Sequence, residues 1–136
     1  MPLTFRCYID PGGRDVIRDW YDARDAAIQG EFVGIIENLQ RKSRATLNEN
    51  MFKALGKRHA SDCLGFYEIL IDSDSGHHYR VLGTLEDNIF TMLFAFCKND
   101  CPRYRIPCKM SRQRRLEVTR DRRRAEECQF PPFDED

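Results

Sequence analysis

The sequence has no apolar stretch that approaches the roughly 20 residues of a membrane-spanning helix. Its first ten residues, MPLTFRCYID, also lack the basic start and the apolar run of a signal peptide. Neither a membrane protein nor an exported protein is therefore expected, and the sequence predicts a cytoplasmic one.

An excess of charge of one sign is also absent, since 22 Lys and Arg balance 22 Asp and Glu. No global field therefore draws the protein to nucleic acid, to a membrane or to an acidic partner. The charges are unevenly placed, however. Residues 98–124 hold eleven Lys or Arg against three Asp or Glu, whereas residues 125–136 hold five acidic residues and no basic one. This pattern predicts a basic arm with an acidic tip, either a solvated helix on which the tip folds back or a contact surface for a polyanion.

The six cysteines include no Cys-x-x-Cys pair, which many zinc and redox sites use. They are Cys7, Cys63, Cys97, Cys101, Cys108 and Cys128. Their wide spacing, in a chain without an export signal, predicts free thiols rather than a disulfide framework. The adjacent His77 and His78 are typical of an exposed turn, and nothing marks a base beside Cys97. We therefore expect no metal site, no cofactor and no cysteine nucleophile.

The length of 136 residues and a hydrophobic share of 41% suit one core. Residues 3–9 alternate as a strand does, and the Asp10-Pro11-Gly12-Gly13 turn ends that strand. Apolar residues then recur at helical spacing over residues 16–27 and 32–39. This pattern predicts two helices that meet near Gly30 and form an antiparallel hairpin.

Three β-rich segments follow, at residues 66–71, 79–85 and 89–96, with a polar hairpin turn at 72–78. The third segment is apolar on both faces, which predicts a central strand covered on both sides. A basic helix is expected from 107 to 127, and the tail 130–136 is not expected to join the core. The predicted fold is a small α+β domain with an antiparallel sheet of three to four strands. Residues 1–106 form the domain, and residues 107–136 are either part of it or appended.

Strand alternation puts Glu68 and Arg80 on one face of this sheet. If the hairpin turn is centred near Ser75, Leu70 opposes Arg80 and Glu68 is the diagonal neighbour of Arg80. One interpretation is a cross-strand ion pair between Glu68 and Arg80. The other is functional, because Lys98 follows the central strand and more cations precede the meander. These are Lys53, Lys57, Arg58 and His59.

Such groups suit a phosphodiester. RNA is cleaved through its own 2′-hydroxyl when a base takes the hydroxyl proton, cations stabilise the phosphorane and an acid protonates the leaving 5′ oxygen. Tyr104 lies between Arg103 and Arg105. Aromatic residues that stack on the bases of single-stranded RNA often lie among cations in the same way. The alternative for Tyr104 is a half-buried position at the start of a helix.

Four segments resemble the RelE/ParE toxin superfamily, in particular its HigB-like and phage-derived branch. They are Phe52-Lys53-Ala54-Leu55, Phe66-Tyr67-Glu68-Ile69, Tyr79-Arg80-Val81-Leu82, and Phe94-Ala95-Phe96-Cys97-Lys98 followed by Pro102. Their order and the helical hairpin upstream of them agree with the family. The resemblance implies a toxin of a type II toxin–antitoxin pair, an endoribonuclease that cuts ribosome-bound mRNA without a metal.

By position, the resemblance implies that Arg80 holds the scissile phosphate, Lys98 adds charge beside it, and Lys53 is a base or a phosphate ligand. The implied partners are the ribosome, mRNA and a helix-turn-helix antitoxin, through which the protein would form oligomers. Three positions depart from the family pattern: Leu70 and Asn99 stand where cations are usual, and Cys101 replaces a threonine. The alternative is a non-catalytic protein on the same scaffold, such as a gyrase inhibitor or an orphan phage-derived relative.

Overall fold

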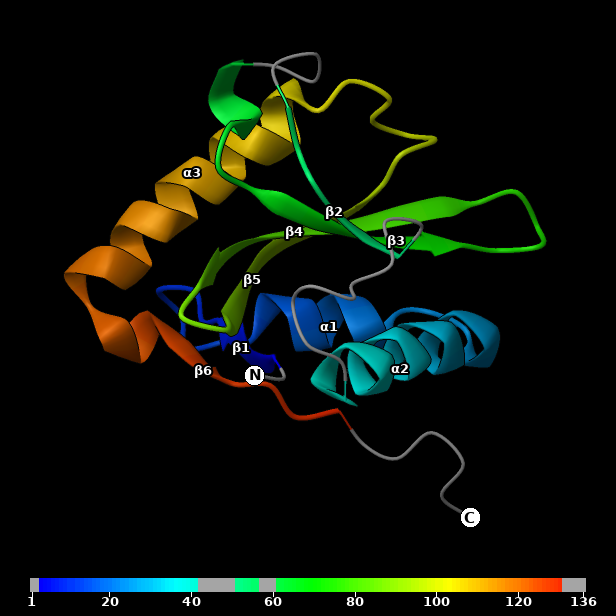
Figure 1. Cartoon of the computed structure of the whole chain (residues 1–136), viewed down its shortest axis with the longest axis horizontal. Coiled ribbons are helices and arrows are strands. Elements are labelled where there is room, and N and C mark those ends of the chain that lie inside the picture. The colour runs from blue at the N-terminus through cyan, green and yellow to red at the C-terminus, as the bar shows by residue number, and fades with distance from the viewer. Residues whose placement is uncertain (1–2, 42–50, 57–60, 131–136) are drawn as a thin grey trace.

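The computed structural model describes residues 3–41, 51–56 and 61–130 (Figure 1). Six strands form one mixed sheet in the order β2-β3-β4-β5-β1-β6. Figure 1 shows α1 and α2 on one face of this sheet and α3 on the other. The fold class is α+β, as predicted. None of the described helices combines the length and the apolar character that crossing a membrane requires.

The sheet is larger than the predicted antiparallel one of three to four strands. Its strands are β1 (Thr4–Tyr8), β2 (Phe52–Ala54), β3 (Tyr67–Asp72), β4 (His78–Glu86), β5 (Ile89–Cys97) and β6 (Ala125–Glu127). β1 pairs with β5 in parallel, and the other neighbours are antiparallel. β2 and β6 have three residues each, too few for alternation to identify them from the sequence.

The meander β3-β4-β5 confirms the prediction for residues 66–96. β5 lies between β4 and β1 and contacts α1 and α3, so it is central and covered on both faces as expected. Leu70 is the register partner of Arg80, which is the predicted pairing. The tight β4–β5 turn places Asp87 and Asn88 at φ values of 50° and 65°. Two left-handed residues in a two-residue loop are typical of a type I′ hairpin.

The first two helices are α1 (Val16–Asp22) and α2 (Ala26–Arg41), so they divide at residues 23–25 and not near Gly30. The reason is local capping. The carboxylate of Asp15 accepts hydrogen bonds from the backbone N–H groups of Ile17 and Arg18, and that of Asp25 accepts one from Ile28. Gly30 lies within α2, where a glycine costs stability but does not end the helix.

The basic helix α3 (Arg105–Arg120) is shorter than the predicted 107–127. After it, a 3₁₀ turn (Arg122–Arg124) capped by Asp121 leads into β6, which pairs with β1. α3 packs on the sheet with Pro107, Cys108 and Ser111, whereas Leu116 is 51% exposed. Its buried residues are not large apolar ones, so hydrophobic periodicity in the sequence does not identify this face.

One core cluster lies between the sheet and α1–α2, and a second lies between the sheet and α3. The tail contributes to the first, contrary to expectation. The ring of Phe130 packs on those of Tyr21 and Phe32, with centroid distances of 4.9 and 5.2 Å. Phe130 is thus a partly buried residue that packs against the first core cluster.

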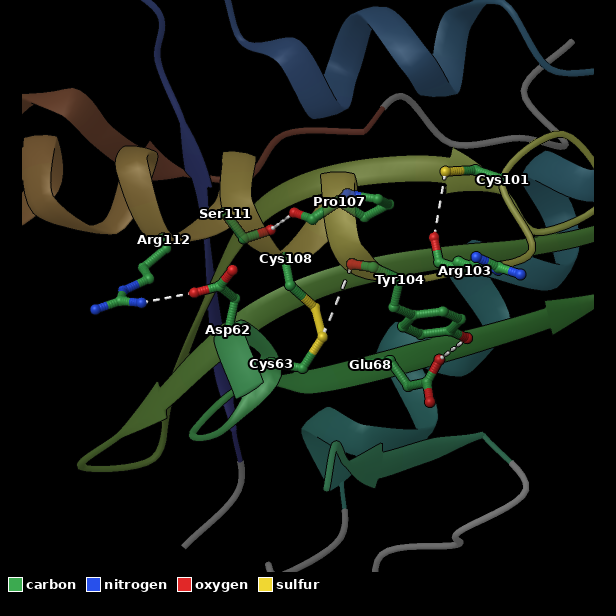
Figure 2. The surroundings of a disulfide bond; sticks show 10 residues. All are labelled: Asp62, Cys63, Glu68, Cys101, Arg103, Tyr104, Pro107, Cys108, Ser111 and Arg112. Atoms are coloured by element: carbon green, nitrogen blue, oxygen red, sulfur yellow. Dashed lines mark hydrogen bonds and ion pairs between the residues drawn. A yellow bond between two sulfur atoms is a disulfide. The ribbon is translucent and has the colours of Figure 1, made fainter. Parts of the chain in front are cut away.

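Four of the six cysteines form disulfides, so the prediction of free thiols was wrong for them. Cys7 is bonded to Cys128, and Cys63, in the 3₁₀ turn η2 (Ser61–Cys63), is bonded to Cys108 of α3 (Figure 2). Cys97 and Cys101 are free thiols. The partners are 121 and 45 residues apart in the sequence. Spacing along the chain could not show that β1 meets the C-terminal segment or that η2 meets α3.

Candidate active site at the hairpin end of the sheet

Three polar side chains form a connected group where β3 passes into β4. Asp72 ends β3 and is the register partner of His78, which begins β4. One carboxylate oxygen of Asp72, Oδ1, accepts a hydrogen bond from Arg80 Nη1 at 2.9 Å and lies 2.7 Å from His78 Nδ1. The side chains of His78 and Asp72 are 47% and 50% exposed, whereas that of Arg80 is 7% exposed. This His78–Asp72–Arg80 cluster therefore runs from the surface into the protein.

The inner end of the cluster is a buried ion pair. Arg80 Nε lies 3.5 Å from Glu68 Oε1, and Glu68 is fully buried. The interpretation of Glu68 and Arg80 as a cross-strand ion pair is thus confirmed. Burial alone would lower the pKa of Arg80, but the hydrogen bond and the charge of Asp72 raise it above its ordinary value. Arg80 is therefore a permanently charged group that two carboxylates hold in place.

Tyr104 lies in the core, where it cannot stack on a base. It is 5% exposed, and its ring meets that of Phe96 edge-on. Its hydroxyl donates a hydrogen bond to Glu68 Oε1 at 2.7 Å (Figure 2). Burial, together with the hydrogen bond and the charge of Glu68, raises the pKa of Tyr104. The predicted role in RNA stacking is corrected to a structural one, in which Tyr104 ties the start of α3 to the sheet.

Lys98 and Lys53 lie on opposite sides of this buried pair. Lys98 directly follows β5, and its backbone N–H donates to the carbonyl of His78 at 2.6 Å. The structure therefore brings Lys98 and Arg80 to the same end of the sheet. Lys53 is the register partner of Glu68 on β2, so it shares the face of Glu68 but lies two strands away from Arg80.

The remaining predicted site residues fall into two groups. Arg103 and Arg105 flank Tyr104 and are exposed at the start of α3. Lys57, Arg58 and His59 lie outside the described residues. Of the nine predicted positions, Lys98, Arg103 and Arg105 remain candidates for contact with a ligand. The buried Arg80 remains a candidate for a supporting role.

Asn99 stands where the pattern of the RelE/ParE superfamily has a second lysine. In the structure, its side chain forms two hydrogen bonds with the β3–β4 hairpin. Its side-chain oxygen accepts a hydrogen bond from the His78 backbone N–H at 2.9 Å, and its nitrogen donates to the Gly76 carbonyl at 3.0 Å. Asn99 thus braces the hairpin that carries the cluster. A lysine, which has no acceptor atom, could not make the first of these bonds.

Asp72 and His78 are the functional candidates that the sequence analysis missed, because it took residues 72–78 as a polar turn. The signal was present. If Leu70 opposes Arg80, the residues two positions further along each strand, Asp72 and His78, must oppose each other. Extending the predicted register by one pair would have placed a carboxylate beside an imidazole.

The negative charge of Asp72 determines which ring nitrogen of His78 carries the proton. Partial burial would raise the pKa of Asp72, but the hydrogen bonds with Arg80 and His78 lower it below its ordinary value. The ionised carboxylate favours a proton on His78 Nδ1, which leaves Nε2 to accept or donate a proton at the surface. The described residues hold no group of three or more His, Cys, Asp or Glu side chains that could bind a metal ion.

Comparisons with known protein families, with curated proteins and with solved structures found no match. The case for a function at this site therefore rests on its geometry and on the sequence resemblance.

Proposed function

We propose that this chain is the toxin of a type II toxin–antitoxin pair, a RelE-like endoribonuclease that cuts ribosome-bound mRNA through its 2′-hydroxyl. The observation that carries the proposal is the His78–Asp72–Arg80 cluster, next to which the backbone N–H of Lys98 is bonded to the carbonyl of His78. The order of elements also supports it, because a strand, two helices, an antiparallel meander and a helix follow one another as the resemblance implies.

The exposed His78 and the partly exposed Lys98 supply the chemistry. His78 Nε2 takes the proton from the 2′-hydroxyl, whose oxygen then attacks the phosphorus. The Lys98 ammonium stabilises the charge of the phosphorane and protonates the 5′ oxygen as its bond to phosphorus breaks. The products are a 2′,3′-cyclic phosphate and a free 5′-hydroxyl. No metal takes part in these steps.

Arg80 has a different role from the one that the resemblance implies. Its guanidinium is nearly inaccessible and is already bound to Asp72 and to the carbonyl of Tyr79. It holds Asp72, which in turn orients His78, so we assign it as a positioning residue. The substrate-facing cations are then Lys98 and the exposed Arg103 and Arg105.

The proposed biological setting follows from the same assignment. The protein would act in the cytoplasm on the ribosome and mRNA, and an antitoxin would neutralise it and carry it into an oligomer. The proposed domain includes α3 and β6, because Cys108 ties α3 to η2 and β6 pairs with β1.

The test is primer extension on mRNA in a translating extract that contains the purified full chain. In His78→Asn, the side-chain amide can still donate to Asp72, but the variant has no counterpart of Nε2. We expect its cleavage rate to fall by about 10²–10⁴-fold, the usual contribution of a general base. His77→Asn is the matched control, since His77 is the adjacent exposed histidine and has no contact with Asp72 among those described. Equal cleavage by both variants would remove His78 from the mechanism.

A second candidate function is supported by the burial of Arg80 and by Leu70 and Asn99 at positions where the family has cations. On this view the chain is a non-catalytic binding protein, such as a gyrase inhibitor or an orphan relative. Intact transcripts with the unaltered chain, together with inhibited DNA supercoiling, would support this candidate and exclude the nuclease.

A further inference from the structure

A cavity of about 280 Å³ opens between the C-terminal half of α3 and the sheet, at the opposite end of β4 from His78. It shares no residue with the His78–Asp72–Arg80 cluster. Its polar lining consists mainly of arginine and threonine. The residues that matter here are Arg6, Thr84, Thr91, Arg115, Thr119 and Arg122.

The floor of the cavity follows from strand register. Thr91 on β5 is the partner of Thr84 on β4 and of Arg6 on β1, so three neighbouring strands place these side chains in one row on one face. Above them, α3 contributes Arg115 and the following 3₁₀ turn contributes Arg122. Five elements from three separate regions of the sequence thus contribute residues to one hollow.

Most of these donors could still form hydrogen bonds with a ligand. Thr84 is 8% exposed, and within the described part of the chain neither its hydroxyl nor that of Thr91 forms a hydrogen bond. Arg6 uses one amino group on the carbonyl of Ala125. Arg122 is exposed and has no ion pair among the described residues. Arg115 forms an ion pair with Glu86 at 3.7 Å, a distance too long for a hydrogen bond, so its N–H groups can still donate to a ligand. The hydroxyl of Thr119, by contrast, already donates to the carbonyl of Arg115.

Guanidinium groups with hydroxyl donors are the groups that proteins use to bind phosphate oxygens. The three arginines outnumber the two lining carboxylates, Glu86 and Asp87, and three apolar side chains complete the wall: Ile89, Leu93 and Val118. The volume is near the lower limit for small-molecule sites. We propose that this cavity binds a phosphate monoester that carries an organic group, such as a nucleoside monophosphate, either free or as the phosphorylated end of an RNA.

The test is calorimetric titration of the full chain, at constant ionic strength, with AMP and with adenosine. We expect AMP to bind at least about tenfold more tightly than adenosine, because the arginines contact only the phosphate. Titration with the same short RNA with and without a 5′-phosphate then identifies the source. A gain from the 5′-phosphate assigns the site to RNA ends, and no gain assigns it to free nucleotides.

Two adjacent arginines give a matched pair of variants. Arg122→Gln removes a cavity donor, and Arg123→Gln removes the same charge from a side chain that is 91% exposed and paired with Asp121. Arg122→Gln should weaken AMP binding by about tenfold or more, and Arg123→Gln by less than about twofold. Thr84→Val is an independent probe of the floor and should also weaken binding. Equal affinities for AMP and adenosine, or equal losses in the two arginine variants, would overturn the proposal.

Discussion

Asp72 connects the exposed His78 to the buried Arg80, and its protonation state should therefore affect stability. Because its pKa in the folded protein is below the ordinary value, its contribution is fully present above the ordinary pKa of 3.8. The contribution is lost as the pH falls through the lower folded-state pKa. We expect Asp72→Asn to lower the free energy of unfolding at pH 7 by at most about 1 kcal/mol, since the side chain is half exposed.

Urea unfolding at pH 7 and below about pH 2 measures this difference, which should disappear at the acid pH. Asp74→Asn is the control, because Asp74 is exposed in the same turn and has no described contact. A loss in Asp72→Asn that remains in acid would show that the effect comes from packing and not from the charge.

Arg80 also shows how far sequence reasoning reaches at the scale of single residues. Its pairing with Leu70 and its closeness to Glu68 follow from alternation and hairpin length, which are local properties. Its burial depends on α3, which brings Tyr104 onto Glu68 from 36 residues away in the sequence. Packing of that kind leaves no periodic signal in the strand, so the ion pair was one of two interpretations of the sequence, whereas the inaccessibility of Arg80 could not be predicted.

Among the elements, those with strong periodicity were predictable and the others were not. The three strands of the meander and α1–α2 bury large apolar residues at regular spacing. α3 departs from this rule, because an arginine contributes to its packing. The guanidinium of Arg114 packs over the rings of Tyr8 and Phe94 and donates a hydrogen bond to the carbonyl of Leu93. An arginine in that position appears in the sequence as one more surface charge.

The Cys63–Cys108 disulfide fastens η2 to α3, and its loss should loosen the cover of the buried Glu68 pair. We expect Cys63→Ala/Cys108→Ala to lower the free energy of unfolding by about 2–4 kcal/mol, the usual contribution of a disulfide. Urea unfolding measures it. Cys97→Ser/Cys101→Ser is the control, because both of those cysteines are free thiols.

A thiol titration of the denatured, unreduced chain tests the pairing directly and should find two free thiols per molecule. Six free thiols would contradict both disulfides. Two disulfides in protein purified from cells would also count against the proposed cytoplasmic setting, because disulfides persist where the surroundings are oxidising and are rare in a reducing cytosol.

Although the net charge of the whole molecule is zero, acidic and basic residues are concentrated on different faces. Residues 14–41, which include α1 and α2, carry six Asp or Glu against four Lys or Arg. Residues 98–124, which include α3, carry eleven basic residues against three acidic ones. Figure 1 shows these helices on opposite sides of the sheet. Such a field orients a polyanion towards α3 even though the protein as a whole is neutral.

The affinity of the full chain for a labelled single-stranded RNA should therefore depend on salt mainly through the α3 face. Arg105 and Lys109 are exposed there, whereas Arg14 and Arg41 are exposed on the side of α1 and α2. In Arg105→Gln/Lys109→Gln, the slope of log affinity against log salt should become shallower by about 1.4, because each lost phosphate contact accounts for about 0.7. Arg14→Gln/Arg41→Gln removes the same charge and should leave the slope unchanged. Equal changes of slope in the two double variants would mean that RNA affinity depends only on the net charge of the protein. RNA would then not bind preferentially to the α3 face.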